Sequence, residues 1–197
     1  MVGKSIVFSF KRLDDDTVAE GTYGTNLTWV LDSEGTLTVS GVGAMNDYSS
    51  YSSVPWYSNR SAIKKAVLGK TVLSVGSYAF YGCTNLTSIT LPQSVTSLGE
   101  YAFSGCTSLA SIDIPDNVTS IGDYAFYGST SLSSVTIPES VTAIGNYVFY
   151  GCESITNVVL PPKITVIRAN AFSGCRSLSS ITFPDSLERI EMEAFAN

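Results

Sequence analysis

The chain of 197 residues contains no histidine, and this absence removes several kinds of active site. A Ser-His-Asp triad, a Cys-His pair and a His-ligated zinc or iron site each need at least one imidazole. Charged residues are also scarce, at 14% of the chain, against roughly 25% in an average soluble domain. The 17 acidic and 11 basic residues give a net charge of −6. A nucleic-acid partner would require a basic surface, so we expect none.

Long apolar runs are missing as well. No stretch approaches the roughly 20 residues of a membrane helix, so we expect no membrane insertion. The first ten residues, MVGKSIVFSF, do not have the apolar length or the cleavage site of a signal peptide. Hydrophobic residues nevertheless make up 44% of the chain, which predicts that most of it folds.

A 23-residue repeat runs through the last two thirds of the chain. Its most regular column is phenylalanine, at Phe80, Phe103, Phe126, Phe149, Phe172 and Phe195. A proline column follows the same period, at Pro92, Pro115, Pro138, Pro161 and Pro184. Aliphatic columns keep the register too, as in Leu86, Leu109, Leu132, Ile155 and Leu178. Such a unit cannot bury its apolar columns alone, so we expect stacked coils around a continuous core.

Each unit contains two predicted extended segments and one turn. Leu-x-x-Ile-x-Leu-Pro indicates a short strand that proline ends. Val-x-x-Ile-Gly indicates a second extended piece, and we expect its glycine to turn the chain with a positive φ, at Gly76, Gly99, Gly122 and Gly145. Tyr-Ala-Phe should form a helical turn that points the phenylalanine inward. A second glycine, at 82, 105, 128, 151 and 174, should close that turn.

This repeat, as in LPQSVTSLGEYAFSGCTSLASI, closely resembles the BspA-like leucine-rich repeat. The resemblance covers residues 63–197, and the segments LTWVLDSEGTLTVSGVGAMNDY and VPWYSNRSAIKKAVL are similar to the hairpin and connector that precede such arrays. It implies an α/β repeat fold: a right-handed leucine-rich-repeat solenoid of about six coils, with one parallel β-sheet, short helical turns and an N-terminal β-hairpin cap. At the strand spacing of about 4.8 Å, the array should be roughly 30 Å long.

The residues before the array predict the cap independently. Leu27, Trp29 and Leu31 alternate with polar residues, a turn sequence from Asp32 to Gly35 follows, and a second alternation comes next. We expect Trp29 to cover the first coil. The predicted organisation is an unassigned segment at 1–20, a cap and connector at 21–62, and the array at 63–197. Within the first segment, a strand is possible at Ile6, Phe8 and Phe10.

The four cysteines share one column of the repeat, at Cys83, Cys106, Cys152 and Cys175, with Ser129 in the remaining place. We interpret this column as buried thiols that contribute packing. Neighbouring coils are close enough that distance alone does not exclude a disulfide bond between Cys83 and Cys106 or between Cys152 and Cys175. Ligands spread along a stack do not converge, which disfavours a zinc site.

Two further motifs have simple structural explanations. Gly69-Lys70-Thr71 is similar to the end of a phosphate loop, but Lys64 stands where that motif needs its first glycine. The triplet Asp14 to Asp16 lacks the spacing of a calcium loop. We therefore predict no cofactor, no metal and no catalytic residue. An enzyme would need converging carboxylates, and Asp113 has no acidic neighbour in the adjacent strands.

The candidate functional residues lie between the apolar columns of the first strand and should face outward. They are Ser88, Thr90, Ser111, Asp113, Ser134, Thr136, Asn157, Ser180 and Thr182, with Val159 beside Asn157. This surface is either a recognition face that uses hydrogen bonds or a merely solvated face. Tyr81, Tyr127 and Tyr150 form a partial aromatic row, either as interface anchors or as packing between coils.

The family resemblance implies a non-catalytic protein-binding or adhesion module of a bacterial cell-surface or secreted protein. Its partner would be a protein or glycan, for example in the host extracellular matrix. The alternative is a structural spacer or intracellular scaffold with no tight ligand. At the C-terminal end, the strand around Leu178, Ile181 and Phe183 should keep an unpaired edge and exposed apolar surface. Three explanations are open. The sequence is cut from a longer protein, another copy of the chain covers the edge end to end, or the charged residues of 188–193 cap it.

Overall fold

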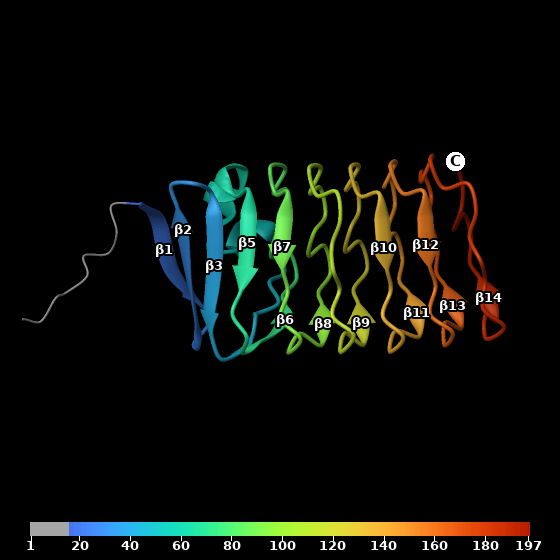
Figure 1. Ribbon diagram of the computed structural model, residues 1–197, viewed down its shortest axis with the longest axis horizontal. Coiled ribbons are helices and arrows are strands. Elements are labelled where there is room, and N and C mark those ends of the chain that lie inside the picture. Colours follow the sequence, from blue (N-terminus) through green and yellow to red (C-terminus); the bar gives the residue numbers. More distant parts are fainter. Residues whose placement is uncertain (1–15) are drawn as a thin grey trace, which may run out of the picture.

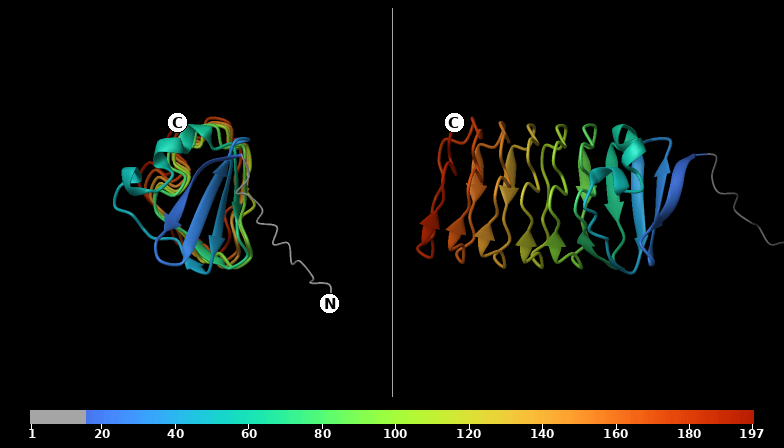
Figure 2. Two further views of the ribbon diagram at one scale, coloured as in Figure 1. Left: turned by 90° about the vertical axis from the view of Figure 1, so that its left-hand side faces the viewer. Right: turned by 180° about the vertical axis from the view of Figure 1, so that it is seen from behind.

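The computed structural model describes residues 16–197, so the possible strand at Ile6, Phe8 and Phe10 lies outside the described residues. The described chain is an elongated solenoid whose coils stack side by side along the long axis, from β1 at one end to β14 at the other (Figure 1). Viewed along this axis, the coils superimpose closely behind the N-terminal strands (Figure 2). The predicted repeat solenoid is confirmed.

The cap is a three-stranded antiparallel sheet formed by β1 (Thr17–Tyr23), β2 (Leu27–Asp32) and β3 (Thr36–Gly41). The predicted hairpin is β2 and β3, and β1 is an additional strand. The Asp32 carboxylate closes the hairpin turn by accepting from the N–H groups of Glu34 at 3.1 Å and Thr36 at 2.7 Å. Because β3 pairs in parallel with the first strand of the array, β5, the cap continues directly into the solenoid.

The first strand of each repeat contributes to what we call the repeat-strand face. Its strands are β5 (Lys65–Leu68), β7 (Ser88–Thr90), β10 (Ser134–Thr136) and β12 (Asn157–Val159). Parallel partners lie one repeat apart, as in Val135 and Val158. The sheet is interrupted between β7 and β10, where Ser111 forms an isolated bridge to Ser134. Asp113 stands here in the position of Thr90, and aspartate is a poor strand residue.

The second extended segment of each repeat builds a second strand face. Its strands are β4 (Gly43–Ala44), β6 (Val72–Val75), β8 (Ser97–Leu98), β9 (Ser120–Ile121), β11 (Ala143–Ile144), β13 (Val166–Ile167) and β14 (Arg189–Ile190). These strands also pair in parallel, and they form one sheet from β4 to β9 and another from β11 to β14. The solenoid therefore has two series of parallel strands, where the sequence predicted one parallel sheet with short strands and turns on the opposite side.

The Tyr-Ala-Phe segments form runs of tight turns. In the first coil, Tyr81 N–H donates to Tyr78 O at 3.0 Å within the turn, while Phe80 N–H donates to Ala102 O at 2.8 Å in the next coil. Two 3-10 helices, η1 (Tyr51–Ser53) and η2 (Tyr57–Ala62), are the helices of the described residues, and both belong to the connector before the array.

The turn glycines do not act as the sequence suggested. Gly76, Gly99, Gly122 and Gly145 lack a positive φ, so that prediction is wrong. The left-handed residue comes two positions later, with φ between 55° and 63°, at Tyr78, Tyr101, Tyr124, Tyr147, Asn170 and Glu193. Glycine is needed instead because the coils approach closely: a Cβ on Gly122 would lie 2.6 Å from the backbone nitrogen of Glu100. The later glycines, such as Gly128 with φ +67°, do take the predicted conformation.

The core runs the full length of the array. The phenylalanine column forms a continuous stack, with ring centroids 5.2 to 5.4 Å apart from Phe80 to Phe195. At the N-terminal end, Trp56 is fully buried and its centroid lies 6.0 Å from that of Phe80. Trp29 packs edge-on against Trp56 at 5.8 Å, so it covers the first coil as predicted. No helix in the described part of the chain is long and apolar enough to cross a membrane.

Candidate functional site

All nine predicted partner-binding residues are exposed on the repeat-strand face. Five of them lie on strands, with Ser88 and Thr90 on β7, Ser134 and Thr136 on β10, and Asn157 on β12. The other four, Ser111, Asp113, Ser180 and Thr182, occupy equivalent positions of coils that lack a regular strand here. Their alternation with buried residues follows from the pleat, which points successive side chains to opposite sides. The structure therefore brings the predicted set together on one surface.

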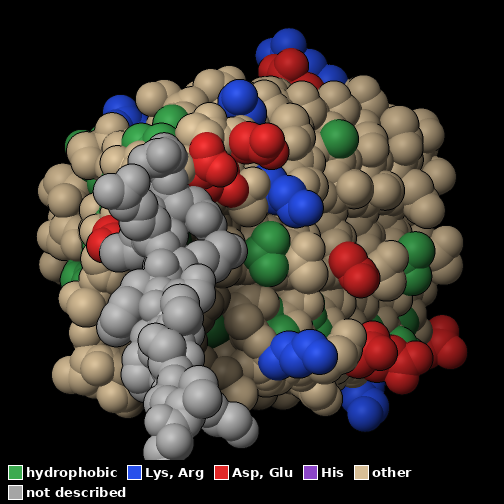
Figure 3. Space-filling model, turned by 60° about the vertical axis from the view of Figure 1, so that its left-hand side comes forward, with side chains coloured by type: hydrophobic (Ala, Val, Ile, Leu, Met, Phe, Trp, Pro, Cys, Tyr) green, Lys and Arg blue, Asp and Glu red, His purple; other side chains and the backbone are tan. Residues whose placement is uncertain are grey.

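The chemical character of the surface is polar with little charge. Asp113 is the one ionisable side chain among the nine residues. In the view of Figure 3, which brings the N-terminal end forward, the charged groups are few and scattered among backbone and side chains of other kinds. Recognition by such a face would depend on hydrogen bonds and on the few apolar side chains that reach the surface.

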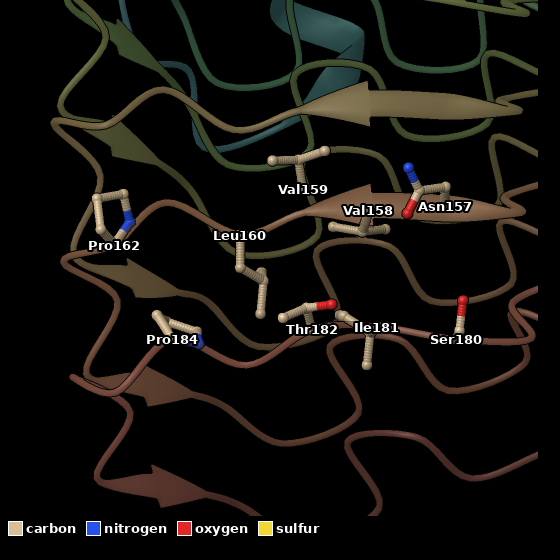
Figure 4. Close-up of a pocket in the computed structure, with 9 residues that line it drawn as sticks. All are labelled: Asn157, Val158, Val159, Leu160, Pro162, Ser180, Ile181, Thr182 and Pro184. Atoms are coloured by element: carbon tan, nitrogen blue, oxygen red, sulfur yellow. The ribbon is translucent and has the colours of Figure 1, made fainter.

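One apolar side chain on this face is unusually exposed. Val159 at the end of β12 has an exposed fraction of 53%. It borders a depression of about 360 Å³ between β12 and the segment 180–184 (Figure 4). Val158, Leu160 and Ile181 supply further apolar lining, and Asn157, Ser180 and Thr182 supply polar groups. Three of the predicted residues thus lie in a concave part of the face.

The depression exists because the final coil departs from the regular pattern. β12 pairs with β10 on one side, whereas the segment 179–184 on its other side forms no strand. Pro162 and Pro184 line the end of the depression. Our sequence reasoning missed both as site residues. The available signal was the pair Pro161-Pro162, because the other four prolines of this column, at 92, 115, 138 and 184, are each followed by a residue other than proline.

A second depression, of about 610 Å³, lies at the other end of the face, where β5 and β7 end. Thr90 lines it together with Val67, Leu91 and Lys70. The adjacent Gly69 N–H donates to Val39 O at 2.8 Å, and Thr71 Oγ1 donates to Gly41 O at 2.6 Å. These groups hold the cap to the array, which agrees with the structural interpretation of the Gly-Lys-Thr motif.

The cysteine column is buried and carries free thiols, as predicted. Each of three sulfurs donates to a phenylalanine carbonyl in the preceding coil, for example Cys106 Sγ to Phe80 O at 3.2 Å. Ser129 Oγ makes the equivalent bond to Phe103 O at 2.9 Å. Burial raises the pKa of the Cys83 thiol to about 12. Such thiols remain protonated near neutral pH and are poor nucleophiles.

Within residues 16–197, no group of three or more histidine, cysteine, aspartate or glutamate side chains is placed to hold a metal ion. The predicted row of Tyr81, Tyr127 and Tyr150 is present beside the turns, and Tyr127 and Tyr150 stack at 4.9 Å. Tyr127 has an exposed fraction of 37%.

Comparisons with known proteins agree with this geometry. The BspA type leucine rich repeat region matches residues 50–197 in six copies. A comparison with curated protein sequences gives no significant match.

Several solved bacterial structures share the fold. A leucine-rich repeat protein of T. pallidum has a TM-score of 0.68 and 24% identity, over 87% of this chain and 85% of that one. A protein of Faecalibacterium prausnitzii, described as a leucine rich cell surface protein, has a TM-score of 0.71 and 29% identity, over 92% of this chain and 53% of that one. A leucine-rich repeat protein of Bacteroides ovatus has a TM-score of 0.59 and 24% identity, over 92% and 55%.

This chain spans about half the length of the Faecalibacterium and Bacteroides proteins. The family match covers about three quarters of the chain, and the stacked 23-residue coils supply its physical basis. The chain therefore belongs to the BspA-type leucine-rich repeat family.

Proposed function

We propose that the chain is a non-catalytic binding module that recognises a protein or glycan partner through its repeat-strand face. The observation that carries the proposal is the apolar-lined depression beside Val159, set among exposed polar side chains of two neighbouring coils. Interfaces commonly combine an apolar anchor point with a surrounding rim of hydrogen-bonding groups. Here Asn157, Ser180 and Thr182 supply that rim.

Localisation at the cell surface or outside the cell is part of the same proposal. It is supported by the description of the Faecalibacterium protein, which shares 29% identity with this chain. The lack of histidine and the raised pKa of the buried Cys83 thiol support a non-catalytic role. The net charge of −6 supports a partner other than nucleic acid. Adhesion to host extracellular matrix would satisfy these conditions.

A binding screen against immobilised matrix proteins and glycans tests the proposal. The variant Ser134→Lys/Thr136→Lys places two cations on β10, in the middle of the face, and should weaken binding at least tenfold. Its matched control is Ser120→Lys/Thr142→Lys, which adds the same charge to exposed positions of the second strand face. Val159→Asp should also weaken binding, because it places a charge at the apolar anchor point.

Two results would overturn the proposal. Equal binding by the β10 variant and its control would mean that the partner uses another surface. Absence of binding to every matrix protein and glycan would instead favour the spacer or scaffold alternative.

A further inference from the structure

The larger of the two depressions on the repeat-strand face lies at its N-terminal end. It has a volume of about 610 Å³ and is found where β5 and β7 end. Its apolar lining comes from Val67, Leu91 and Pro92, which are all partly exposed. Val67 stands four repeats before Val159. The two depressions therefore occupy the same place in their coils, and the larger one also presents an apolar surface to solvent.

The depression opens where the ladder of strand hydrogen bonds ends. Thr87 N–H donates to Lys64 O at 2.8 Å, and the pairing of the two coils continues as far as Val67 and Thr90. Parallel ladders have evenly spaced bonds, but beyond this point Leu91 N–H donates to no backbone carbonyl of residues 16–197. The two coils therefore separate here, and the wall of the depression keeps a backbone donor.

Two consecutive turns hold the far end of the depression in place. Val72 N–H donates to Gly69 O at 3.0 Å across the first turn, and Val95 N–H donates to Pro92 O at 3.0 Å across the second. Ser94 Oγ joins the two turns by donating to Val72 O at 2.5 Å. The walls are thus fixed before a ligand arrives, which reduces the entropy cost of binding.

The charge around the depression is positive, although the chain as a whole is acidic. Residues 48–99 contain four basic residues and no acidic residue, whereas the net charge of the chain is −6. One of the four, Lys70, lines the depression and is exposed. In the part of the chain that the structure describes, Lys70 forms no ion pair. An anionic group of a partner would therefore find a complementary charge here.

The acidic residues of the surrounding elements lie at a distance from Lys70. Asp116 follows it two repeats later, and Asp113 follows Val67 two repeats later, so each lies two coils away, at roughly 10 Å. The hairpin turn with Glu34 lies at the other end of β5, where Gly35 O accepts from Lys65 N–H at 3.1 Å. The positive region is therefore confined to the depression and β5.

We propose that this depression, the Lys70 site, binds a segment of a partner protein in which an aliphatic side chain stands next to a carboxylate. The aliphatic side chain covers Val67, Leu91 and Pro92, and the carboxylate pairs with the Lys70 ammonium group. A sugar fits less well, because its hydroxyl groups would lie against these apolar side chains without hydrogen-bond partners.

This inference rests on the proposed function and deepens it, since it states the chemistry of the partner at one end of the repeat-strand face. The two can nevertheless fail separately. Binding of matrix proteins by a chain whose Lys70 site binds no acidic peptide would contradict this inference alone. Binding of an acidic peptide by a chain that binds no matrix protein or glycan would support the Lys70 site and contradict the wider proposal.

The probe is acetyl-Leu-Glu-amide, titrated into the intact chain while the backbone N–H signals of Val67 and Leu91 are followed by NMR. A contact of this size should have a dissociation constant on the order of millimolar. Acetyl-Leu-Gln-amide has nearly the same shape but no charge, and it should bind at least fivefold more weakly. Acetyl-Ser-Glu-amide keeps the charge but lacks the aliphatic side chain, and it should bind at least fivefold more weakly as well.

Two substitutions remove the two features of the site separately. Lys70→Gln should weaken binding of acetyl-Leu-Glu-amide at least fivefold and leave the weaker binding of acetyl-Leu-Gln-amide unchanged. Val67→Thr should weaken binding of both peptides. The fold should tolerate both changes, because the next coil has Gln93 and Thr90 at the equivalent positions. The matched control is Lys163→Gln, which removes the same charge from an exposed lysine that does not line the depression.

Any of three results would refute the Lys70 site. The first is a folded Lys70→Gln protein that binds acetyl-Leu-Glu-amide as tightly as the unchanged chain. The second is the absence of signal shifts at Val67 and Leu91 up to the solubility limit of the peptide. The third is a response to methyl glucuronide without a response to the peptide, which would assign the depression to acidic glycans.

Discussion

The indole Nε1 of Trp56 donates a hydrogen bond to the backbone carbonyl of Ala79 at 2.7 Å. In the next coil, the equivalent carbonyl of Ala102 accepts from the backbone N–H of Phe80. The first coil has no regular coil before it, so the side chain of Trp56 replaces a backbone donor. The tryptophan therefore caps the open end of the array in two ways, through its buried ring and through its N–H group.

The two tryptophans of the cap should differ in how much their N–H groups contribute. Trp29 Nε1 is buried without a hydrogen-bond partner in the described residues. Trp56→Phe leaves the Ala79 carbonyl unpaired, so it should lower the free energy of unfolding by about 1–3 kcal/mol more than Trp29→Phe. Urea denaturation followed by circular dichroism measures both values. Equal losses would show that the Trp56 hydrogen bond contributes little.

Alanine should destabilise the fold more at a glycine in contact with a neighbouring coil, such as Gly122, than at a glycine with a positive φ, such as Gly128. A Cβ on Gly122 would meet backbone atoms of Gly99 and Glu100 at 2.7 and 2.6 Å, and these cannot move without separating two coils. Gly122→Ala should cost about 3 kcal/mol, at the upper end of overpacking. Gly128→Ala has open space and only an unfavourable φ, so it should cost about 1 kcal/mol. The reverse order in thermal denaturation would contradict the argument.

Serine should replace cysteine in the thiol column at small cost. Cys106→Ser keeps a donor for Phe80 O, in the geometry that Ser129 already shows toward Phe103 O. We expect a loss below about 1 kcal/mol, whereas Cys106→Ala also loses the hydrogen bond and should cost about 1–2 kcal/mol. Chemical denaturation compares the two variants. Similar losses in both would mean that the hydrogen bond is unimportant.

The buried thiols should make the fold sensitive to alkaline pH. Burial raises the pKa of Cys83 to about 12, and burial also raises the pKa values of Cys106, Cys152 and Cys175. Above pH 9 the unfolded thiols ionise while the folded ones stay protonated. Stability should therefore be nearly constant up to about pH 8 and then fall, by up to about 1.4 kcal/mol per pH unit for each thiol.

Denaturation at pH 7 to 11 measures this dependence, and a protein with all four cysteines replaced by serine provides the control. The control should lose most of the slope. Retention of the full slope would assign it to tyrosine ionisation, because the pKa of Tyr101 is also raised to about 12, mainly by burial.

Of the apolar side chains predicted to be exposed at the C-terminal edge, Phe183 is exposed, whereas Leu178 and Ile181 are partly buried against the core. Phe183 is 43% exposed, and Ile190 and Met192 on the same coil are 44% and 72% exposed. We expect self-association at high concentration that Phe183→Ser/Met192→Gln abolishes, measured by light scattering. Val18→Ser is the control at the opposite end, where Val18 on β1 is 56% exposed. A monomer at all concentrations would contradict self-association.

The repeat made most of the architecture predictable, since a 23-residue period places Phe80 over Phe103 and Val135 beside Val158 without further information. The hairpin turn at Asp32 was predictable because local turn chemistry does not depend on distant residues. The roles of the glycines were not predictable. A positive φ at Tyr124 and a backbone contact at Gly122 both depend on how tightly neighbouring coils pack, and no local pattern reports that distance.

The candidate site was predictable in part. Pleat alternation placed Ser134 and Thr136 on an exposed face, where the structure has them. The depression beside Val159 was not foreseen, because it results from a lack of strand pairing between β12 and the next segment. Likewise, the sequence showed a partial row of tyrosines but not that neighbouring rings such as those of Tyr127 and Tyr150 stack in parallel.

Hydrogen bonds between coils point in opposite directions on different sides of the solenoid. At the turns, Phe80 N–H donates forward to Ala102 O, whereas beside the second strand face Gly99 N–H donates backward to Val75 O. The peptide dipoles along the axis therefore oppose one another, in contrast to an α-helix, where they add. This array should consequently have little net axial dipole despite its regularity.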